Sequence, residues 1–421
     1  MNKPVSVLII GAGSRGQIYA QFAQQYPERM RVVGVAEPRA FQREQMAQTY
    51  GLPPENVFSD WREVASRGRL ADAVVIATQD AQHVEPVEAL APQGYAILLE
   101  KPMAPDLEGS LRIVRAVETH GNLFAVCHVM RYTPYTQLLK RVLDSGAIGE
   151  IVSVEHLEPV GYWHQAHSFV RGNWRREDQS SSMLLQKSCH DLDWLRYLLG
   201  QSCTRISSFG SLKHFRAEEK PEGAAERCLD CSIEPTCPYS AKRIYGRHLA
   251  SGFTGWPLNV LTPEPTPESV AQALREGPYG RCVYACDNDV VDHQVVNMEF
   301  AKGQTASFTM TAFTQMRPRE TRIFGTRGEL YGDGRQIRVY DFLTETTLSH
   351  DSQAATDGSI LSGHGGGDFA LMERFIASVA TGDPSGILSG ARESLEGHLM
   401  VFAAERARKE GRVVRLEELE S

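Results

Sequence analysis

The sequence predicts an α/β protein built in two parts. The first part is a doubly wound parallel sheet, and the second is an α+β domain with a large, mostly antiparallel open sheet. Three observations carry this prediction. A glycine-rich turn follows an apolar strand within the first 16 residues, strands and helices alternate as far as about residue 130, and strands joined by glycine and charged turns dominate residues 291–341.

The glycine-rich turn has the spacing of a dinucleotide-binding loop. Residues 7–10 are four consecutive apolar residues, and Gly11, Gly13 and Gly16 follow as GxGxxG at the start of a helix. Gly11 permits a tight turn, Gly13 lets a pyrophosphate contact the backbone, and Gly16 lets the helix pack closely on the strand. This context predicts a Rossmann domain, whereas an ordinary strand-to-helix turn with incidental glycines is the alternative.

An acidic residue stands where such a domain binds the adenosine ribose. Glu37 ends strand 31–36, about twenty residues after the turn. Its carboxylate would repel a 2′-phosphate, so NAD is preferred over NADP, although Arg39 leaves use of both possible. Ser14 and Arg15 open the helix whose N-terminal N–H groups would face the pyrophosphate.

Composition excludes several classes of protein. The 421 residues are enough for two or three domains, and 42% of them are hydrophobic. Lys and Arg total 44 against 52 Asp and Glu, with no concentrated basic block, so neither nucleic acid nor a membrane is an expected partner. No signal-peptide region and no stretch of about 18 apolar residues is found, and a cytoplasmic protein is therefore expected.

The first domain is assigned to residues 1–130 from the alternation of elements with short links. Helices are predicted at 15–26, 39–50, 84–93 and 106–120, and strands at 31–36, 73–77, 96–99 and 123–126.

The second domain is assigned to residues 131–421. After a helix at 134–144 and a strand at 151–157, further strands are predicted at 291–301, 305–314, 321–325, 328–331 and 336–341. Helices at 183–199, 367–381 and 389–409 are expected to cover one face of this sheet. Residues from about 213 to 287 form an insertion rich in Pro, Gly and Cys, with little periodicity.

Glu100, Lys101 and Pro102 follow the strand at 96–99, where the carboxyl edge of a parallel sheet faces the cofactor crevice. A partly desolvated Lys101 beside a positive nicotinamide ring would have its ammonium form disfavoured, which suits proton exchange with a substrate hydroxyl. The alternative is a solvated surface lysine.

These motifs together resemble the glucose-fructose oxidoreductase/inositol dehydrogenase/rhizopine-catabolism (Gfo/Idh/MocA) family. The matching segments are the GxGxxG turn, Thr78 with His83, Glu100-Lys101-Pro102, Arg131-Tyr132-x-Pro134, and residues 145–150 before a strand. The resemblance implies a nicotinamide cofactor in the first domain, a sugar or polyol against the second domain's sheet, and Lys101 at the redox carbon. It also implies a homodimer or homotetramer.

The resemblance carries over a set of cofactor-binding residues, which are Gly11, Gly13, Ser14, Arg15, Gly16, Glu37, Thr78, His83, Glu100 and Lys101. Arg131 as a substrate contact and Tyr132 as a catalytic group would lie at the domain junction. Their alternative role is packing between the domains.

A polar stripe is predicted on the helix at 183–199, because Gln186, His190 and Asp193 have the spacing i, i+4, i+7. The family pattern places its active-site His at His190, whereas a satisfied core histidine is the alternative. Gln186 stands where the family usually has Asp, and a neutral amide can orient a hydroxyl but cannot act as a base. Lys187 either binds the substrate or pairs with Asp191 at the surface.

This substituted stripe also resembles a branch of the family that uses tightly held NAD to hydrolyse glycosides. There, transient oxidation at C3 of the sugar permits elimination and hydration before the hydride returns. The segment Gly363-His364-Gly365-Gly366-Gly367-Asp368 resembles that branch as well. His364 would then contact the sugar, whereas a flexible turn with an Asp cap is the alternative.

Residues 161–176 are aromatic and polar, which suits stacking on a sugar and contacts to its hydroxyls. Trp163, His167 and Arg171 are the candidate substrate contacts. Alternatively, the aromatic rings fill the space beneath the loop.

The insertion contains a cysteine pattern suited to a structural metal. Cys228, Cys231 and Cys237 lie close together, and Cys282 would complete four ligands for zinc, with Cys286 as its substitute. Free buried thiols or a disulfide are the alternatives. A catalytic metal is not expected, because the thiolates lie in an insertion.

The leading hypothesis is therefore an NAD-dependent enzyme that oxidises a hydroxyl carbon of a sugar, polyol or glycoside, with Lys101 and His190 handling protons. A redox-neutral NAD-dependent glycosidase is the alternative. A non-catalytic NAD-sensing or sugar-binding module is a third class, and the presence of both Lys101 and His190 argues against it.

Overall fold

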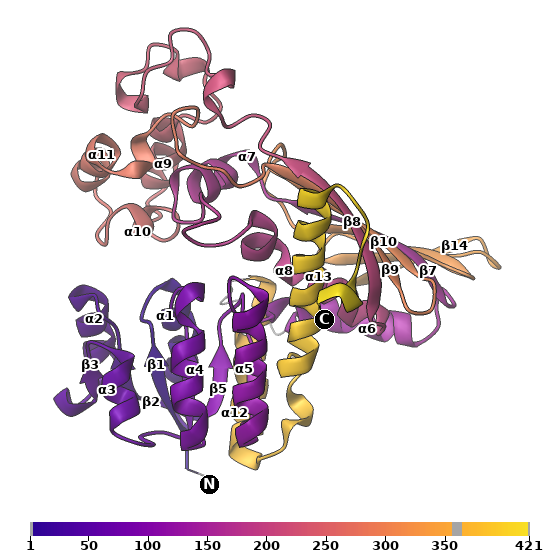
Figure 1. Cartoon of the computed structure of the whole chain (residues 1–421), viewed down its shortest axis with the longest axis horizontal. Coiled ribbons are helices and arrows are strands. Elements are labelled where there is room, and N and C mark those ends of the chain that lie inside the picture. Colours follow the sequence, from indigo (N-terminus) through magenta and orange to yellow (C-terminus); the bar gives the residue numbers. More distant parts are fainter. Residues whose placement is uncertain (1–2, 356–363, 420–421) are drawn as a thin grey trace.

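The computed structural model describes residues 3–355 and 364–419, and it contains two sheets (Figure 1). The first sheet is entirely parallel and has the strand order β3-β2-β1-β4-β5-β6. This order is that of a Rossmann domain, with the reversal between β1 and β4. Its strands are β1 (Val5–Ile10), β2 (Met30–Ala36), β3 (Val57–Phe58), β4 (Ala73–Ile76), β5 (Ala96–Leu99) and β6 (Phe124–Val126). The predicted fold class of this part is confirmed.

The helices between these strands lie close to their predicted positions. They are α1 (Ser14–Gln25), α2 (Ala40–Tyr50), α4 (Val84–Leu90) and α5 (Leu107–His120). In α5 the Asp106 side chain accepts a hydrogen bond from the Gly109 amide at 2.7 Å, and the helix ends at Gly121. The sequence analysis missed β3 and α3 (Trp61–Ser66), which are too short to show periodicity.

Gly11 and Gly16 bring α1 close to the sheet. Gly11 has a positive φ of 89°, and a side chain there would lie 2.5 Å from the Ala77 carbonyl oxygen. A Cβ at Gly16 would lie 2.0 Å from the Gly11 carbonyl oxygen. The tight turn and the close helix packing predicted for these two glycines are therefore present.

The second sheet is mixed and mostly antiparallel. Its order is β14-β13-β12-β11-β7-β10-β9-β8-β15. Among the described strands of this second sheet, only β7 and β10 pair in parallel. The strands are β7 (Ile151–Pro159), β8 (Cys203–Ser211), β9 (His293–Phe300), β10 (Thr305–Thr311), β11 (Glu320–Gly325), β12 (Gly328–Gly332), β13 (Gln336–Asp341), β14 (Thr346–Asp351) and β15 (Val414–Arg415). The prediction is confirmed, although it omitted β8, β14 and β15.

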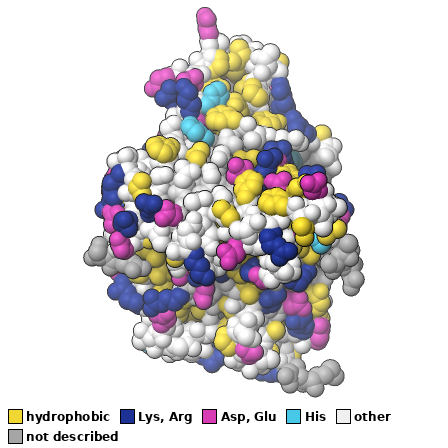
Figure 2. Space-filling view, turned by 90° about the vertical axis from the view of Figure 1, so that its right-hand side faces the viewer, with side chains coloured by type: hydrophobic (Ala, Val, Ile, Leu, Met, Phe, Trp, Pro, Cys, Tyr) yellow, Lys and Arg dark blue, Asp and Glu magenta, His cyan; other side chains and the backbone are white. Residues whose placement is uncertain are grey.

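One face of this sheet is covered by helices. Residues of α6 (Pro134–Asp144), α8 (Met183–Leu199) and α13 (Ala391–Glu410) share a core with the inward side chains of the strands. On the strands, Val152, Phe209 and Leu348 are exposed. Figure 2 views the side of the molecule on which β14 lies in Figure 1, and it shows hydrophobic side chains among Lys, Arg, Asp and Glu.

Helix α12 (Gly367–Thr381) corrects the predicted domain division. The sequence analysis placed it on the second sheet, but Leu371, Phe375 and Ile376 pack in one core with residues of β1 and α1. The chain therefore returns to the first domain after residue 366. The sequence could not assign α12 to the correct sheet, because an apolar stripe shows that one face of a helix is buried but not which sheet it packs against.

Helix α13 joins the two domains directly. Leu395 and Leu399 pack with α5 and the first sheet, whereas Met400, Ala404 and Ala407 pack with α8 and the second sheet. A single long helix thereby fixes how the two sheets face each other.

The inserted segment contains more helix than its sequence suggested. It holds α9 (Ala241–Ala250), α10 (Leu258–Leu261) and α11 (Pro267–Glu276), which share a small core including Ile244, Tyr245 and Leu274.

No helix in residues 3–355 or 364–419 is both long and apolar enough to cross a membrane.

Replacing Gly16 with Ala should lower the free energy of unfolding by about 3 kcal/mol or more, because the new Cβ would collide with backbone. Urea unfolding measures this change. The matched control is Gly246→Ala in α9, where nothing lies within 4 Å, and it should be stabilising by about 0.5–1 kcal/mol. Equal effects of the two substitutions would contradict the packing described for Gly16.

Candidate active site

The glycine turn leaves an open helix end for an anion. Gly13 precedes α1 without any side-chain cap, and Ser14 is exposed at the first helical position. Free N–H groups at such an end bind phosphate oxygens. The residues present therefore fit a dinucleotide, whose pyrophosphate would lie against this turn.

Glu37 borders the same turn. Its carboxylate accepts hydrogen bonds from the Ala12 amide at 2.8 Å and from the Arg39 guanidinium at 2.7 and 2.9 Å. Burial alone would raise the pKa of Glu37, but the hydrogen bonds from Arg39 and Ala12 outweigh it, so this pKa lies below its usual value. The carboxylate is thus held ionised beside the glycine turn.

Arg15 points away from the anion-binding end and into the sheet edge. Its guanidinium contacts Glu100 and Asp368, and its Nη2 donates to the Tyr19 hydroxyl. Burial would raise the pKa of Glu100, but Arg15 and Lys101 lower it overall. Asp368 pairs with Arg15, and the N-cap residue of α12 is Gly366.

The loop after β5 presents Lys101 and is held from two sides. The His83 ring nitrogen Nδ1 lies 2.9 Å from the Pro102 carbonyl oxygen, and its Nε2 lies 3.3 Å from the Thr78 carbonyl oxygen. From α13, His398 Nε2 accepts a hydrogen bond from the Met103 amide at 2.9 Å. Two buried histidines therefore fix the backbone that carries Lys101.

Lys101 reaches helix α8. Its Nζ donates to the Gln186 carbonyl oxygen at 2.7 Å, which places the ammonium one helical turn before His190. The two residues that the sequence assigned to proton transfer are thus brought to the same face of α8.

The predicted polar stripe faces the first domain. The Gln186 amide donates to the Asp80 carboxylate and, at 2.9 Å, to the Ser181 hydroxyl. His190 is 5% exposed, and its ring meets that of His128 edge-on with centroids 5.8 Å apart. The amide of Gln186 is therefore occupied by Asp80, a carboxylate from the opposite domain.

Asp193 completes the stripe with a buried ion pair. Its carboxylate accepts two hydrogen bonds from Arg131, at 2.8 Å from Nε and 2.6 Å from Nη2. Arg131 also donates to the Leu388 carbonyl oxygen, and each of the paired side chains is 1% exposed. Arg131 thus makes contacts between the domains, as in the alternative role that the sequence analysis gave it.

Tyr132 lies beside this pair with its hydroxyl used inside the protein. The hydroxyl lies 2.8 Å from Ser389 Oγ and accepts a hydrogen bond from the Leu388 amide at 2.8 Å. Burial raises the pKa of Tyr132. The structure thus shows this side chain joining β6 to the start of α13.

Lys187 and Asp191 do not pair with each other, which corrects one alternative drawn from their spacing. Lys187 Nζ lies 3.2 Å from Glu158, and Arg319 Nε lies 3.0 Å from the other Glu158 oxygen. Asp191 is buried against Arg319 and His156. Both side chains of α8 face the sheet instead of solvent, because tertiary partners on β7 and before β11 outcompete the weak i,i+4 pair.

The aromatic loop splits between the site and the insertion. His167 Nδ1 lies 2.9 Å from the Tyr245 hydroxyl, and Arg171 donates to the carbonyl oxygens of Tyr239 and Arg281. The predicted substrate contacts His167 and Arg171 are therefore held by the inserted segment. Trp163 is half-buried, with its ring 5.2 Å from that of Trp256.

Two residues that the sequence analysis did not select lie at the site. Burial lowers the pKa of His164 well below its usual value, and the charges of Lys187 and Lys101 act in the same direction. Asp80 holds the Gln186 amide. Asp80 follows β4 and so lies at the same sheet edge as Lys101, and this position in the sequence could have identified it as a site residue. Nothing in the spacing of the loop distinguished His164 from His167.

The glycine-rich segment before α12 is only partly described. Gly363 lies outside the described residues, and so does the side chain of His364, whose backbone begins the short helix His364–Gly366. The proposed sugar contact of His364 thus falls outside the described part of the chain.

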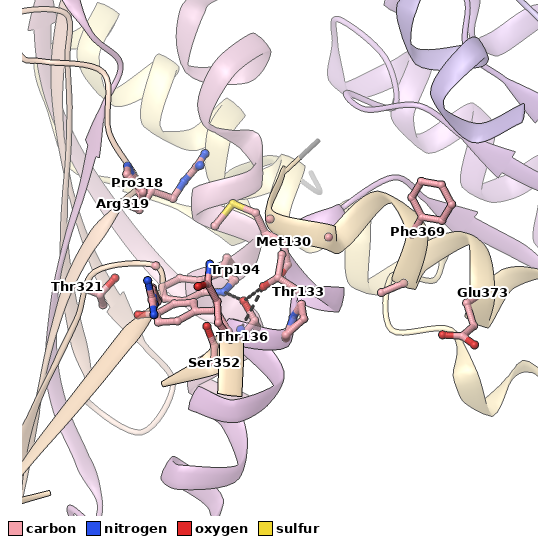
Figure 3. A pocket seen from close by; sticks show the side chains of 18 of the residues that line it. Met130, Thr133, Thr136, Trp194, Pro318, Arg319, Thr321, Ser352, Phe369 and Glu373 are labelled. Atoms are coloured by element: carbon pink, nitrogen blue, oxygen red, sulfur yellow. Dashed lines mark hydrogen bonds between the residues drawn. The ribbon is translucent and has the colours of Figure 1, made fainter. Parts of the chain in front are cut away.

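A cavity of about 600 Å³ lies between α6, α8, the strand edge near β11 and α12 (Figure 3). Trp194 donates to the Thr136 hydroxyl at 2.9 Å in its wall, and Arg319 and Phe369 also line it. Neither Lys101 nor His190 lines this cavity, whereas Arg319, which pairs with Glu158 near Lys187, does.

The eight cysteines are all free in the structure, so the disulfide alternative is not formed. In the described part of the chain, no three or more His, Cys, Asp or Glu side chains already have the arrangement of a metal site.

Comparison with known proteins identifies both domains. Residues 5–128 match the GFO_IDH_MocA model, described as an oxidoreductase family with an NAD-binding Rossmann fold. Residues 140–416 match the model of the C-terminal alpha/beta domain of the same oxidoreductase family.

Individual relatives are distant. A putative oxidoreductase YteT of Bacillus subtilis is 22% identical over 76% of this chain and 74% of its own length. An inositol 2-dehydrogenase of Streptomyces avermitilis is 30% identical over 49% of this chain and 57% of its own. A 2,7-anhydro-N-acetylneuraminate hydratase of Escherichia coli is 29% identical over 34% and 37%. The alignments with the latter two thus span about half of those relatives or less.

A solved structure shows the same fold over nearly the whole chain. Levoglucosan dehydrogenase in complex with NADH and levoglucosan covers 98% of this chain and 100% of its own, with a TM-score of 0.71 and 18% identity.

Replacing Asp193 with Asn should lower the free energy of unfolding by about 3–5 kcal/mol, because it leaves the Arg131 guanidinium buried without a counter-charge. Denaturant unfolding followed by circular dichroism measures this. The control Asp178→Asn removes a solvent-exposed partner of Arg176 and should leave the unfolding midpoint unchanged. A midpoint for Asp193→Asn equal to that of the control would show that the buried pair does not hold the domains together.

Proposed function

The chain belongs to the Gfo/Idh/MocA family of oxidoreductases, and we propose that it transfers a hydride from a hydroxyl-bearing carbon of a sugar, polyol or glycoside to NAD. One observation carries the proposal. Lys101, at the carboxyl edge of the parallel sheet, meets α8 at the Gln186 carbonyl oxygen, one turn before His190. The substrate hydroxyl would lie between these two side chains.

The glycine turn and Glu37 support NAD as the cofactor. The uncapped N-terminus of α1 would hold the pyrophosphate, and the Glu37 carboxylate would accept hydrogen bonds from the ribose hydroxyls. When bound, the nicotinamide supplies the hydride acceptor. Ser14, Thr78 and Glu100 border the same sheet edge and complete the proposed cofactor contacts.

In this proposal, Lys101 and His190 position the hydroxyl and take its proton as the carbon is oxidised. His83 and His398 act as positioning residues, because they hold the backbone of residues 102–103. Lys187, with Glu158 and Arg319, forms a polar edge suited to the other sugar hydroxyls. Trp163 and His164 are proposed to contact the substrate from the aromatic side of the site, where their rings lie near that of Trp256.

The relatives favour a carbohydrate substrate. They include proteins named for inositol and levoglucosan dehydrogenation, which act on polyol and sugar hydroxyl groups. We infer the same class of substrate here, since the polar edge around Lys187 combines donors and acceptors without an excess of either charge.

A second candidate is a redox-neutral reaction in which NAD is reduced and reoxidised within one turnover. Gln186 replaces the usual Asp, and its amide is tied to Asp80, so no ionisable side chain stands at that position of α8. A relative named as a hydratase of an anhydro sugar is consistent with this chemistry. Any metal held by the insertion would be structural in either case.

Lys101→Met should reduce turnover by about 10²–10⁴-fold while leaving NAD binding intact, because it removes the group that handles the hydroxyl proton. The assay incubates the protein with NAD and a panel of inositols, free sugars, anhydro sugars and aryl glycosides. It records NADH absorbance together with released aglycone. The control Lys302→Met changes an exposed lysine in the turn between β9 and β10 and should keep full activity.

The two readouts separate the candidate reactions. Stoichiometric NADH supports the dehydrogenase, whereas aglycone release without net NADH supports the redox-neutral enzyme. Inactivity on the whole panel, together with unchanged behaviour of Lys101→Met, would contradict both.

Glu37→Ser should raise the NADP-to-NAD affinity ratio by about 10–100-fold, because it removes the carboxylate that repels a 2′-phosphate and frees Arg39 to bind it. Fluorescence titration with NADH and NADPH measures both dissociation constants. The double variant Glu37→Ser/Arg39→Ala should lose the gain in NADPH affinity. An unchanged ratio in the single variant would place the adenosine ribose elsewhere.

A further inference from the structure

The inserted segment encloses a small cavity whose wall carries four cysteines. Cys228, Cys231 and Cys237 come from its first part, and Cys282 comes from its end. The cavity holds about 20 Å³, which is room for one ion or one water molecule. Cys286 does not line it, and its thiol donates instead to the Cys282 carbonyl oxygen at 3.2 Å. The fold thus selects one set of four thiols from the five in the segment.

A buried charge beside the cavity lacks a carboxylate partner. Arg171 also lines the cavity and is 1% exposed. Its described partners are the carbonyl oxygens of Arg281 and Tyr239 and the Cys228 sulfur, and Nη1 has no hydrogen-bond partner among the described residues. A buried guanidinium without a counter-charge is costly. Glu234 also lines the cavity, but its carboxylate is paired with Ser240 and Lys242. A further anionic group within the cavity would supply a counter-charge for Arg171.

The Cys228 sulfur accepts hydrogen bonds from two donors and lies 3.9 Å from the Arg281 carbonyl oxygen. It accepts hydrogen bonds from Arg171 Nη2 and from the amide of Ala241, the first residue of α9, both at 3.5 Å. A guanidinium and a helix N-terminus therefore both direct positive charge or partial charge at this sulfur. A negatively charged metal–thiolate group fits beside them.

We propose that Cys228, Cys231, Cys237 and Cys282 bind one structural zinc ion. Each thiol releases a proton on binding, so the zinc tetrathiolate carries a net charge of −2, which Arg171 and the N-terminus of α9 face. The cavity has room for a single ion. Four thiolates in a tetrahedral arrangement are a coordination that Zn²⁺ prefers.

Zinc binding must draw the four sulfurs inward from their present positions. Their surroundings permit this, because the chain there consists of the short turns Cys228–Asp230 and Glu234–Thr236 rather than long elements. The ion would then join the start and the end of the insertion. Through Arg171 it would also anchor the segment Gln165–Arg171, which leads towards α8 and the active site.

Metal analysis of the full-length protein, expressed with zinc and purified without chelators, tests this proposal. Wild type should contain about one zinc per chain, and Cys231→Ser and Cys237→Ser should each lose most of it. The controls Cys286→Ser and Cys203→Ser replace cysteines outside the cavity and should retain the zinc.

A second measurement needs no variant. Titration of wild type with a mercurial reagent should release zinc to a chromogenic chelator as the thiols react, and cobalt substitution should give the absorption of tetrahedral Co²⁺ bound to thiolates. Metal-free wild-type protein, stoichiometric iron in place of zinc, or zinc retained by the double variant Cys231→Ser/Cys237→Ser would each overturn the proposal.

Discussion

The buried ion pair of Arg131 and Asp193 is the contact on which the site depends. Arg131 follows the last strand of the first sheet, and Asp193 lies on α8, so the pair joins the two domains where the cofactor edge meets the substrate sheet. Removing either charge alone would leave the other buried without a counter-charge, which is strongly destabilising. The position of α8 relative to β5 is thereby fixed, and with it the approach of Lys101 to the Gln186 carbonyl oxygen.

Helix α8 carries polar residues on two faces, and each face serves one domain. Gln186, His190 and Asp193 face the first domain, whereas Lys187 and Asp191 face Glu158, Arg319 and His156 of the sheet region. A helix polar on opposite sides cannot simply rest on one hydrophobic core. It is stabilised here because every one of these charges meets a partner in the tertiary structure. The proposed substrate site lies where two domains share one helix.

The histidines show how burial turns titratable groups into structural ones. His83 and His398 hold the Lys101 loop through backbone contacts, and burial lowers the pKa of both. His128 lies between His190 and His398, and burial with the nearby cations lowers its pKa well below the usual value. Neutral rings fill the junction without adding charge next to the Arg131–Asp193 pair. Lys101, in the loop after β5, donates to the Gln186 carbonyl oxygen of α8.

The sequence by itself determined the Rossmann domain, its glycine turn and the spacing of the α8 stripe. These are local patterns: Gly11 has a positive φ, Gly16 packs against the Gly11 carbonyl oxygen five residues earlier, and helical periodicity alone aligns Gln186, His190 and Asp193. The close approach of Ala77 to Gly11, by contrast, comes from the neighbouring strand. The helices α8 and α12 also begin and end at their predicted residues. The short strands β3 and β15 escaped prediction because they have too few residues to show a pattern. The helices α9 and α11 are amphipathic and were missed because they lie in a segment whose Pro, Gly and Cys content indicated loops.

Only the tertiary structure decided which partners the side chains take. Arg15 pairs with Asp368, 353 residues away, and the Gln186 amide with Asp80, 106 residues away. Lys187 takes Glu158 instead of its helical neighbour Asp191, and Arg171 turns to the insertion instead of the substrate. Such choices depend on which elements the fold brings together. Spacing along the chain fixes the direction in which a side chain leaves its helix or strand. It does not show which residue, distant in the sequence, that side chain contacts in the folded protein.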